Sequence, residues 1–202
     1  MTTTALRFAG RLARSRSAVF VCDIQKRFEK LIPHSDALVR TSKMVVDAAV
    51  ELDVPLVVTE QNPAKLLPTV DELRKSFPPE TPVFEKTSFS MITPEVQDQL
   101  SGELQAVESV ILIGIETHVC VFQTAMDLLE QGYDVHVVTD ACSSQKDVDR
   151  LVAFERLKQS GAFLTTAECV VFDLVRDASD PSFRKISNLV KSRAADLKDS
   201  KL

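Results

Sequence analysis

The feature that most constrains the fold is a set of short, unbroken apolar runs, each too short to form a helix. They lie at residues 17–22 (SAVFVC), 54–60 (VPLVVTE), 110–113 and 135–139. The runs are rich in β-branched residues and do not alternate with polar ones, which is typical of strands covered on both faces in a parallel sheet. Two further short segments, residues 82–85 and 162–165, complete a predicted set of six strands.

The segments between several of these runs have the periodicity of helices. Apolar residues recur at helical spacing from about residue 35 to residue 52. Residues 117–130 and 147–159 are also predicted helices, and each is followed by a glycine, which commonly ends a helix. This order predicts the α/β class: a three-layer αβα sandwich with a six-stranded, mostly parallel sheet and right-handed crossovers.

The composition is that of one ordinary globular domain. The chain has 202 residues, of which 45% are hydrophobic and 26% charged, and it contains no low-complexity tract or fixed-period repeat. We therefore predict a single domain over residues 1–202. A last helix is predicted at residues 181–197, and its apolar face would cover either the core or a subunit interface. That face is made of Phe183, Ile186, Leu189 and Val190.

The N-terminal segment is basic. Residues 1–17 contain four arginines and no acidic residue, and their apolar residues share one helical face. Two interpretations are open: a short mitochondrial presequence, or an ordered basic arm over residues 1–16. We favour the arm, because the first predicted strand begins at about Ser17.

Charge and cysteine usage limit the partners and the compartment. A net charge of −5 and a pI of about 5.3 provide no positive field for polyanions, so we do not expect nucleic acid as a partner. No apolar run approaches the roughly 18 to 20 residues of a membrane span, so no membrane is expected either. The four cysteines are widely spaced and form no C-x-x-C pair, which favours a reducing compartment. We predict the cytoplasm, with mitochondrial association left open by the basic segment.

Several polar residues stand where predicted strands end. In a doubly wound sheet, such residues meet in the crevice where the strand order reverses, which is where a site is expected. These candidates are Asp23, Thr59, Glu60, Lys86, the loop after Gly114, and Asp140.

Cys120 has the most suggestive position of the four cysteines. It follows a strand that ends near Gly114 and should lie in the first turn of the next helix. Unpaired N–H groups and the helix dipole stabilise a thiolate there, and the same N–H groups can bind an oxyanion. For Cys22, Cys142 and Cys169 we expect buried, inert side chains.

Asp23 and Lys86 could serve such a thiol. A carboxylate within hydrogen-bond reach can accept the thiol proton, and a nearby ammonium can stabilise the resulting charges. Spacing alone leaves open an ordinary buried salt bridge or a solvated pair.

Three motifs resemble those of isochorismatase-like hydrolases and occur in the order of that family. They are DIQKRF (23–28), EKTSFS (85–90) and GIETHVCV (114–121). The segments VPLVVTEQNP, HVVTDACSS and RLVAFERLKQSGAFLTTAE extend the resemblance over most of the chain. It is closest to the branch of isochorismatase-domain-containing protein 2, in which some relatives are named mitochondrial-associated ribonuclease.

The resemblance implies a catalytic triad: Asp23 as base, Lys86 as electrostatic partner and Cys120 as nucleophile. It also implies a non-proline cis peptide between Ile115 and Glu116, which would direct the N–H of Glu116, beside that of Cys120, at an oxyanion. The implied reaction is hydrolysis of a small-molecule C–N bond of the amide type through a thioester.

The chain departs from the family pattern in two places. Nicotinamidases of the family place an acid and two histidines after the second strand to hold a metal, whereas this chain reads TEQNPAKLLPT there. We therefore expect neither a metal nor another cofactor. Glu116 and His118 replace the usual alanine and the Asp or Asn of many family amidases, which implies a different pocket.

The remaining expectations concern the pocket and the class of protein. His118 would either contact substrate or be structural, and Gln61, Phe28 and Phe89 would line the pocket, unless the two phenylalanines belong to the core. The resemblance also implies a homo-oligomer. Two alternative functions stay open: a ribonuclease, and a scaffold protein that has kept the fold without activity.

Overall fold

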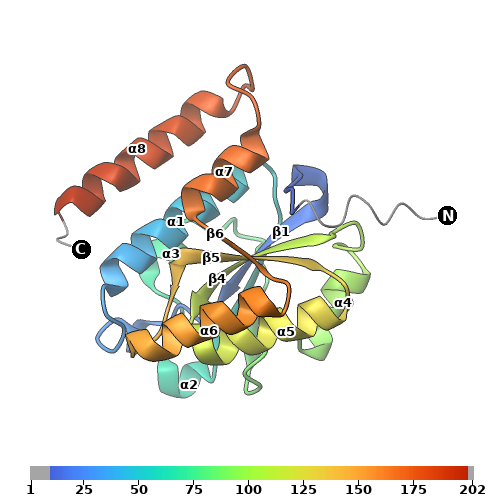
Figure 1. Cartoon of the computed structure of the whole chain (residues 1–202), viewed down its shortest axis with the longest axis vertical. Helices are drawn as coiled ribbons and strands as arrows, with labels where there is room; N and C mark the ends of the chain where they lie inside the picture. Colours follow the sequence, from blue (N-terminus) through green and yellow to red (C-terminus); the bar gives the residue numbers. More distant parts are fainter. Residues whose placement is uncertain (1–9, 200–202) are drawn as a thin grey trace.

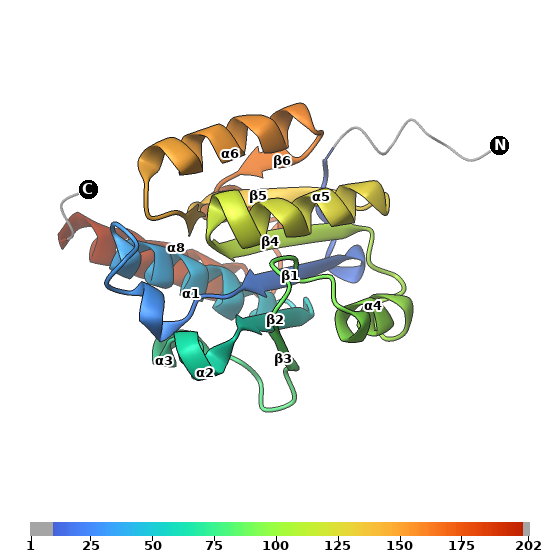
Figure 2. The ribbon, with the colours of Figure 1, turned by 90° about the horizontal axis from the view of Figure 1, so that it is seen from below.

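The computed structural model describes residues 10–199 and contains one six-stranded sheet (Figure 1). Its strands are β1 (Ser17–Cys22), β2 (Leu56–Gln61), β3 (Val83–Lys86), β4 (Ser109–Ile115), β5 (Asp134–Ser143) and β6 (Phe163–Thr165). The strand order is β3-β2-β1-β4-β5-β6, and every neighbouring pair is parallel (Figure 2). The predicted fold class is confirmed, and the sheet is parallel throughout.

Helices cover both faces of the sheet, which gives the three layers seen in Figure 1. On one face lie α1 (Ser35–Glu51), α7 (Ala167–Val175) and α8 (Phe183–Asp199), and on the other α4 (Pro94–Ser101), α5 (Phe122–Glu130) and α6 (Asp147–Gln159). Short helical turns complete the chain: η2 (Arg14–Arg16), η3 (Lys26–Phe28), α2 (Pro63–Leu66), α3 (Asp71–Arg74) and the π-helical turn η4 (Thr117–Val121). No helix among residues 10–199 is long and apolar enough to cross a membrane.

Burial on both faces explains the unbroken apolar runs. Every residue of β1 is buried. Val19 and Val21 pack into the apolar cluster under α1, α7 and α8, whereas Ala18, Phe20 and Cys22 pack into the cluster under α4, α5 and α6. Because alternate side chains point to opposite faces, a strand between two helical layers needs apolar residues at every position.

The C-terminal helix α8 covers the core. Ile186 is fully buried, and Phe183, Leu189 and Val190 pack against the cluster that contains α1. The structure thus shows that the apolar face of this helix covers the core, which is one of the two roles predicted for it.

The N-terminal segment lies against α7 as far as the structure describes it. Leu12 is 2% exposed, its N–H donates to Oδ2 of Asp173 at 2.9 Å, and Arg14 Nη2 lies 2.7 Å from Asp180 Oδ2. Residues 1–9 of the predicted arm lie outside the described part of the chain.

The strand order reverses between β1 and β4, which are neighbours in the sheet. Cys22 is the register partner of Gly114, and a Cβ added to Gly114 would lie only 2.1 Å from the carbonyl oxygen of Cys22. Gly114 also has a φ of +138°, which a side chain would disfavour. Glycine thus allows the two strand ends that should carry the site to approach closely.

Three local features differ from the sequence expectations. β5 continues to Ser143 instead of ending near residue 139, the helix predicted from residue 117 begins with the π-helical turn η4, and α4 and α7 were not predicted. Cys120 consequently lies in η4, directly before α5.

Candidate active site

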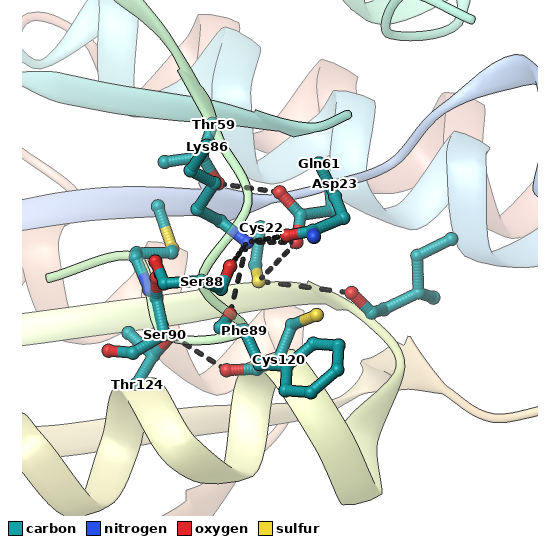
Figure 3. A network of polar contacts seen from close by, with 12 residues as sticks. Cys22, Asp23, Thr59, Gln61, Lys86, Ser88, Phe89, Ser90, Cys120 and Thr124 are labelled. Atoms are coloured by element: carbon teal, nitrogen blue, oxygen red, sulfur yellow. Dashed lines mark hydrogen bonds and ion pairs between the residues drawn. The ribbon is translucent and has the colours of Figure 1, made fainter. Parts of the chain in front are cut away.

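A buried ion pair joins the end of β1, which borders the reversal of strand order, to the end of the edge strand β3 (Figure 3). Asp23 directly follows β1 with a φ of +51°, and Lys86 is the last residue of β3. Lys86 Nζ lies 2.6 Å from Asp23 Oδ2, and the two side chains are 0% and 1% exposed. Thr59, on the intervening strand β2, donates its hydroxyl to Asp23 Oδ1 at 2.8 Å. Three adjacent strands therefore fix the carboxylate.

The Lys86 ammonium is surrounded by oxygen atoms. Besides Asp23, it donates to Oε1 of Gln61 at 2.9 Å and to the carbonyl oxygens of Ser88 and Phe89 at 3.1 and 3.0 Å. These acceptors replace the hydration that the buried charge has lost. Gln61, which was expected to line the pocket, thus holds the lysine in place.

Cys120 lies on the adjoining turn and is 7% exposed. The turn is anchored from behind: Thr124 donates its hydroxyl to the carbonyl of Cys120 at 2.6 Å and accepts from the N–H of Met91 at 2.9 Å. Within residues 10–199, no hydrogen bond links the Cys120 thiol directly to Asp23.

Cys22 lies between Asp23 and Cys120. Its sulfur lies 3.7 Å from Asp23 Oδ2 and 3.8 Å from the carbonyl oxygen of Ile115. Burial, and after it a hydrogen bond with Cys120 and the charge of Asp23, raise the pKa of the Cys22 thiol well above its usual value. Cys22 therefore remains a neutral thiol between the carboxylate and Cys120.

Cys22 was expected to be buried and inert, and its burial and its raised pKa agree with that expectation. Its contact with the site was missed, although one signal was present: alternation along β1 puts residues 18, 20 and 22 on the same face of the sheet. That face is the one covered by η4 and α5.

The other two cysteines differ from each other. Burial raises the pKa of Cys142 to about 12, which agrees with an inert side chain. Cys169 is exposed, so the expectation that it is buried is wrong. The reason is helical phase, since α7 turns Val170 and Val171 toward the sheet and Cys169 away from it.

The nucleophile loop contains the predicted cis peptide between Ile115 and Glu116. The N–H of Glu116 donates to no other residue within the described part of the chain. The Glu116 carboxylate, in contrast, accepts from the backbone N–H and from Nε2 of Gln145, both at 2.9 Å. The side chain of Glu116 therefore ties the loop to the segment after β5, and only its backbone is available as a donor.

His118 contacts the same segment. Its Nδ1 lies 3.0 Å from Ser144 Oγ and its Nε2 4.0 Å from Asp149 Oδ2, while a third of the side chain stays exposed. These contacts are structural, and the exposed part is the only part of His118 that could contact a ligand.

The two phenylalanines of the expected pocket have different positions. Phe89 is 51% exposed, whereas Phe28 packs against the core under α1, on the face of the sheet opposite Cys120. Phe28 packs against the core and also lines a small apolar hollow beside Ile115, whereas Phe89 does not belong to the core.

Glu60, the residue before the end of β2, and Asp140, inside β5, have partners away from the candidate site. Glu60 accepts from the N–H and hydroxyl of Thr69 and from Arg74. Asp140 accepts from the first N–H of α7 and from Arg193. Within residues 10–199, no three His, Cys, Asp or Glu side chains form a group that could hold a metal ion.

Known proteins resemble the chain in sequence and in fold. Residues 17–169 match the isochorismatase domain. The isochorismatase domain-containing protein 2 of Xenopus laevis is 44% identical over 193 residues, which cover 96% of this chain and 92% of that protein. The structure of MAR1 ribonuclease from Caenorhabditis elegans is 44% identical with a TM-score of 0.86, covering 90% of this chain and 92% of that one. The YcaC protein of Escherichia coli, described as an octameric hydrolase of unknown specificity, is 26% identical with a TM-score of 0.76, covering 92% and 97%.

Proposed function

The chain belongs to the isochorismatase family, and on that premise we propose that it is a metal-independent cysteine hydrolase. Its substrate would be a small molecule with an amide-type C–N bond, its nucleophile Cys120, its base Asp23 and its electrostatic partner Lys86.

The observation that carries the proposal is the buried pair of Lys86 and Asp23 beside a thiol. A buried ion pair adds little net stability, because its desolvation cost offsets most of its attraction. Its position where the strand order reverses, beside the turn that holds Cys120, favours a role in proton transfer instead.

The proposed cycle uses only groups of this site. Asp23 takes the proton of Cys120 as the thiolate attacks the carbonyl carbon, and the N–H groups of Glu116 and Cys120 stabilise the oxyanion. The C–N bond then breaks, and the leaving nitrogen takes the proton from Asp23. Water, deprotonated by Asp23, hydrolyses the thioester and restores the free thiol.

The Cys22 sulfur lies 3.7 Å from Asp23 Oδ2, the oxygen to which Lys86 is also bound. The first step therefore requires that Asp23 exchange its contact with Cys22 for one with Cys120. Lys86 remains bound to Asp23 throughout and keeps the carboxylate oriented.

A screen of small amides, ureides and vinyl ethers tests the proposal with the wild type and two variants. We expect at least one amide or ureide to be hydrolysed, with a loss of about 10³-fold or more in Cys120→Ala. Cys142→Ala, the control, should retain the activity. Amide hydrolysis that persists in Cys120→Ala would contradict the proposed nucleophile, and turnover of vinyl ethers alone would contradict the proposed bond.

A ribonuclease is the second candidate, because the similar C. elegans structure carries that name. The net charge of −5 and the missing metal-binding group in residues 10–199 do not favour it, since phosphodiester cleavage usually needs a metal or paired histidines. RNA cleavage by metal-free wild type that is lost in Cys120→Ala would put this candidate first. If the wild type cleaves neither RNA nor any of the small molecules, the remaining interpretation is a scaffold protein without activity.

We also propose that the chain forms a homo-oligomer, which the octameric YcaC structure supports. A cytoplasmic location, with mitochondrial association through the basic N-terminal segment, remains a prediction.

A further inference from the structure

Two cysteine side chains meet at the candidate active site (Figure 3). Cys22 is the last residue of β1, and Cys120 lies in η4 directly before α5. Both are buried in the apolar cluster under α4, α5 and α6, and their thiols are within hydrogen-bond reach of each other. The proposed hydrolysis gives a chemical step to Cys120 only, so it leaves the second thiol of the site without a function.

The pairing is specific to these two cysteines. Cys142 lies in the same apolar cluster, but Cys22 and Cys142 are both register partners of Gly114, so β4 separates them. Strands in a sheet are about 4.8 Å apart, which puts the Cα atoms of Cys22 and Cys142 about 9.6 Å apart, beyond the roughly 7 Å that a disulfide can span. Cys169 is on α7, which covers the opposite face of the sheet. Of the four cysteines, all within the described chain, only Cys120 is within reach of Cys22.

Asp23 is placed to assist a reaction of Cys22. Its Oδ2 lies 3.7 Å from the Cys22 sulfur, whereas no hydrogen bond of residues 10–199 links it directly to the Cys120 thiol. A carboxylate at this position can accept the Cys22 proton when the sulfur attacks an electrophile. The electrophile that a reactive thiol provides is its sulfenic acid, which forms with hydroperoxides and condenses with a neighbouring thiol to a disulfide.

We propose that Cys120 and Cys22 form an oxidation site for hydroperoxides, in which Cys120 is oxidised and Cys22 resolves it to a disulfide. The Cys120 sulfur attacks the O–O bond of hydrogen peroxide and keeps one oxygen as a sulfenic acid, while the other oxygen leaves with the thiol proton as water. Cys22 then attacks the Cys120 sulfur and passes its proton to Asp23. The S–S bond forms, the S–O bond breaks, and the hydroxide takes the proton from Asp23. Two thiols and one peroxide thus give one disulfide and two molecules of water.

The disulfide would reversibly block the proposed hydrolysis. It ties up the nucleophile until a thiol reductant restores both cysteines, and it protects Cys120 from irreversible oxidation to the sulfinic acid. The inference rests on the proposed function in one respect, because both need a reactive thiol at Cys120. Its test reads mass and needs no substrate, so the two can fail separately.

Mass spectrometry of the full chain after hydrogen peroxide treatment tests the proposal. We expect the reduced wild type to lose two hydrogen atoms at the mass of a single chain, peptide mapping to join Cys22 to Cys120, and dithiothreitol to reverse both changes. Cys142→Ala is the matched control, because it removes a buried cysteine of the same cluster, and it should form the same disulfide. Cys120 that gains oxygen atoms without a link to Cys22 would overturn the inference and leave the proposed nucleophile standing. Cys120 that stays unmodified would also overturn the inference, and the amide screen then decides the hydrolase separately.

The variant Cys22→Ala tests the resolving step. Without the second thiol, the sulfenic acid of Cys120 cannot be captured, so sulfinic acid at Cys120 should accumulate about tenfold or more faster than in the wild type. Far-ultraviolet circular dichroism checks that the variant folds, and the wild-type peptide map does not depend on it. Equal rates of sulfinic acid formation in Cys22→Ala and the wild type would show that Cys22 does not resolve Cys120.

Discussion

Lys86 reaches across β2 to place its ammonium 2.6 Å from the carboxylate of Asp23, which follows β1. The pair is out of contact with solvent, and the strand between them contributes Thr59 as a further donor to the same carboxylate. The site thus depends on three neighbouring strands of a parallel sheet ending at the same edge.

Removing both partners of this pair should cost clearly less stability than the sum of the two single removals. Asp23→Asn leaves the Lys86 charge unpaired and Lys86→Met leaves the Asp23 charge unpaired, so each should lower the free energy of unfolding by about 3 to 5 kcal/mol. The double variant should lose clearly less than the sum, as measured by urea denaturation. Strict additivity would show that the two charges do not stabilise each other.

The same variants should lose activity on any amide that the screen identifies. Asp23→Asn removes the proposed base and should lower kcat/KM by about 10²- to 10⁴-fold. The double variant, although more stable than expected from the singles, should be no more active than Asp23→Asn. Activity that recovers together with stability would mean that the pair is structural only.

Gly114→Ala should disrupt the strand ends that form the site. Its Cβ would meet the backbone of Cys22 at 2.1 Å, and backbone atoms cannot rotate away. Gly161→Ala is a matched control, because Gly161 also has a positive φ, +101°, but no atom within 4 Å of the added Cβ. We expect a loss of about 1 to 2 kcal/mol for Gly161→Ala and a clearly larger loss for Gly114→Ala in thermal or urea unfolding. Equal losses would show that φ alone matters at both positions.

His136 should make the fold sensitive to acid. Burial lowers the pKa of this histidine from 6.5 to about 4, and its ring is stacked on Phe163 with centroids 4.9 Å apart. Because the folded-state pKa is the lower one, the unfolded chain binds more protons between pH 6.5 and 4, and stability falls as the pH drops through that window.

Between pH 7 and pH 5 this effect amounts to about 2 kcal/mol. His136→Phe removes the titrating group and should reduce the loss of stability over that interval by this amount, as measured by urea denaturation at both pH values. An equal loss in the variant and the wild type would assign the acid sensitivity to other groups.

One physical reason explains why the sequence predicted both the parallel sheet and the closeness of Asp23 and Lys86. Strands buried on both faces have unbroken apolar runs, so the residues that end those runs, such as Asp23 and Lys86, could be placed at one edge of the sheet. The motif resemblance then predicted the cis peptide at Ile115 and Glu116, which the structure contains.

Other features depend on geometry that a single sequence does not determine. The phase of β2 turns Thr59 toward Asp23 and Glu60 toward Thr69 and Arg74, although both residues end the same run. The Glu116 contact with Gln145 joins loops 29 residues apart. Such contacts require the relative placement of two loops, which no local pattern encodes.

The most direct test of the proposed nucleophile compares two cysteines within one molecule. Cys169 is exposed in the first turn of α7, whereas Cys120 is 7% exposed in η4, so accessibility alone favours alkylation of Cys169. Peptide mass spectrometry after iodoacetamide treatment at pH 6.5 should show Cys120 alkylated about tenfold or more faster, with this advantage lost in Asp23→Asn. Faster alkylation of Cys169, or an advantage of Cys120 that persists in Asp23→Asn, would contradict activation of Cys120 by the buried pair.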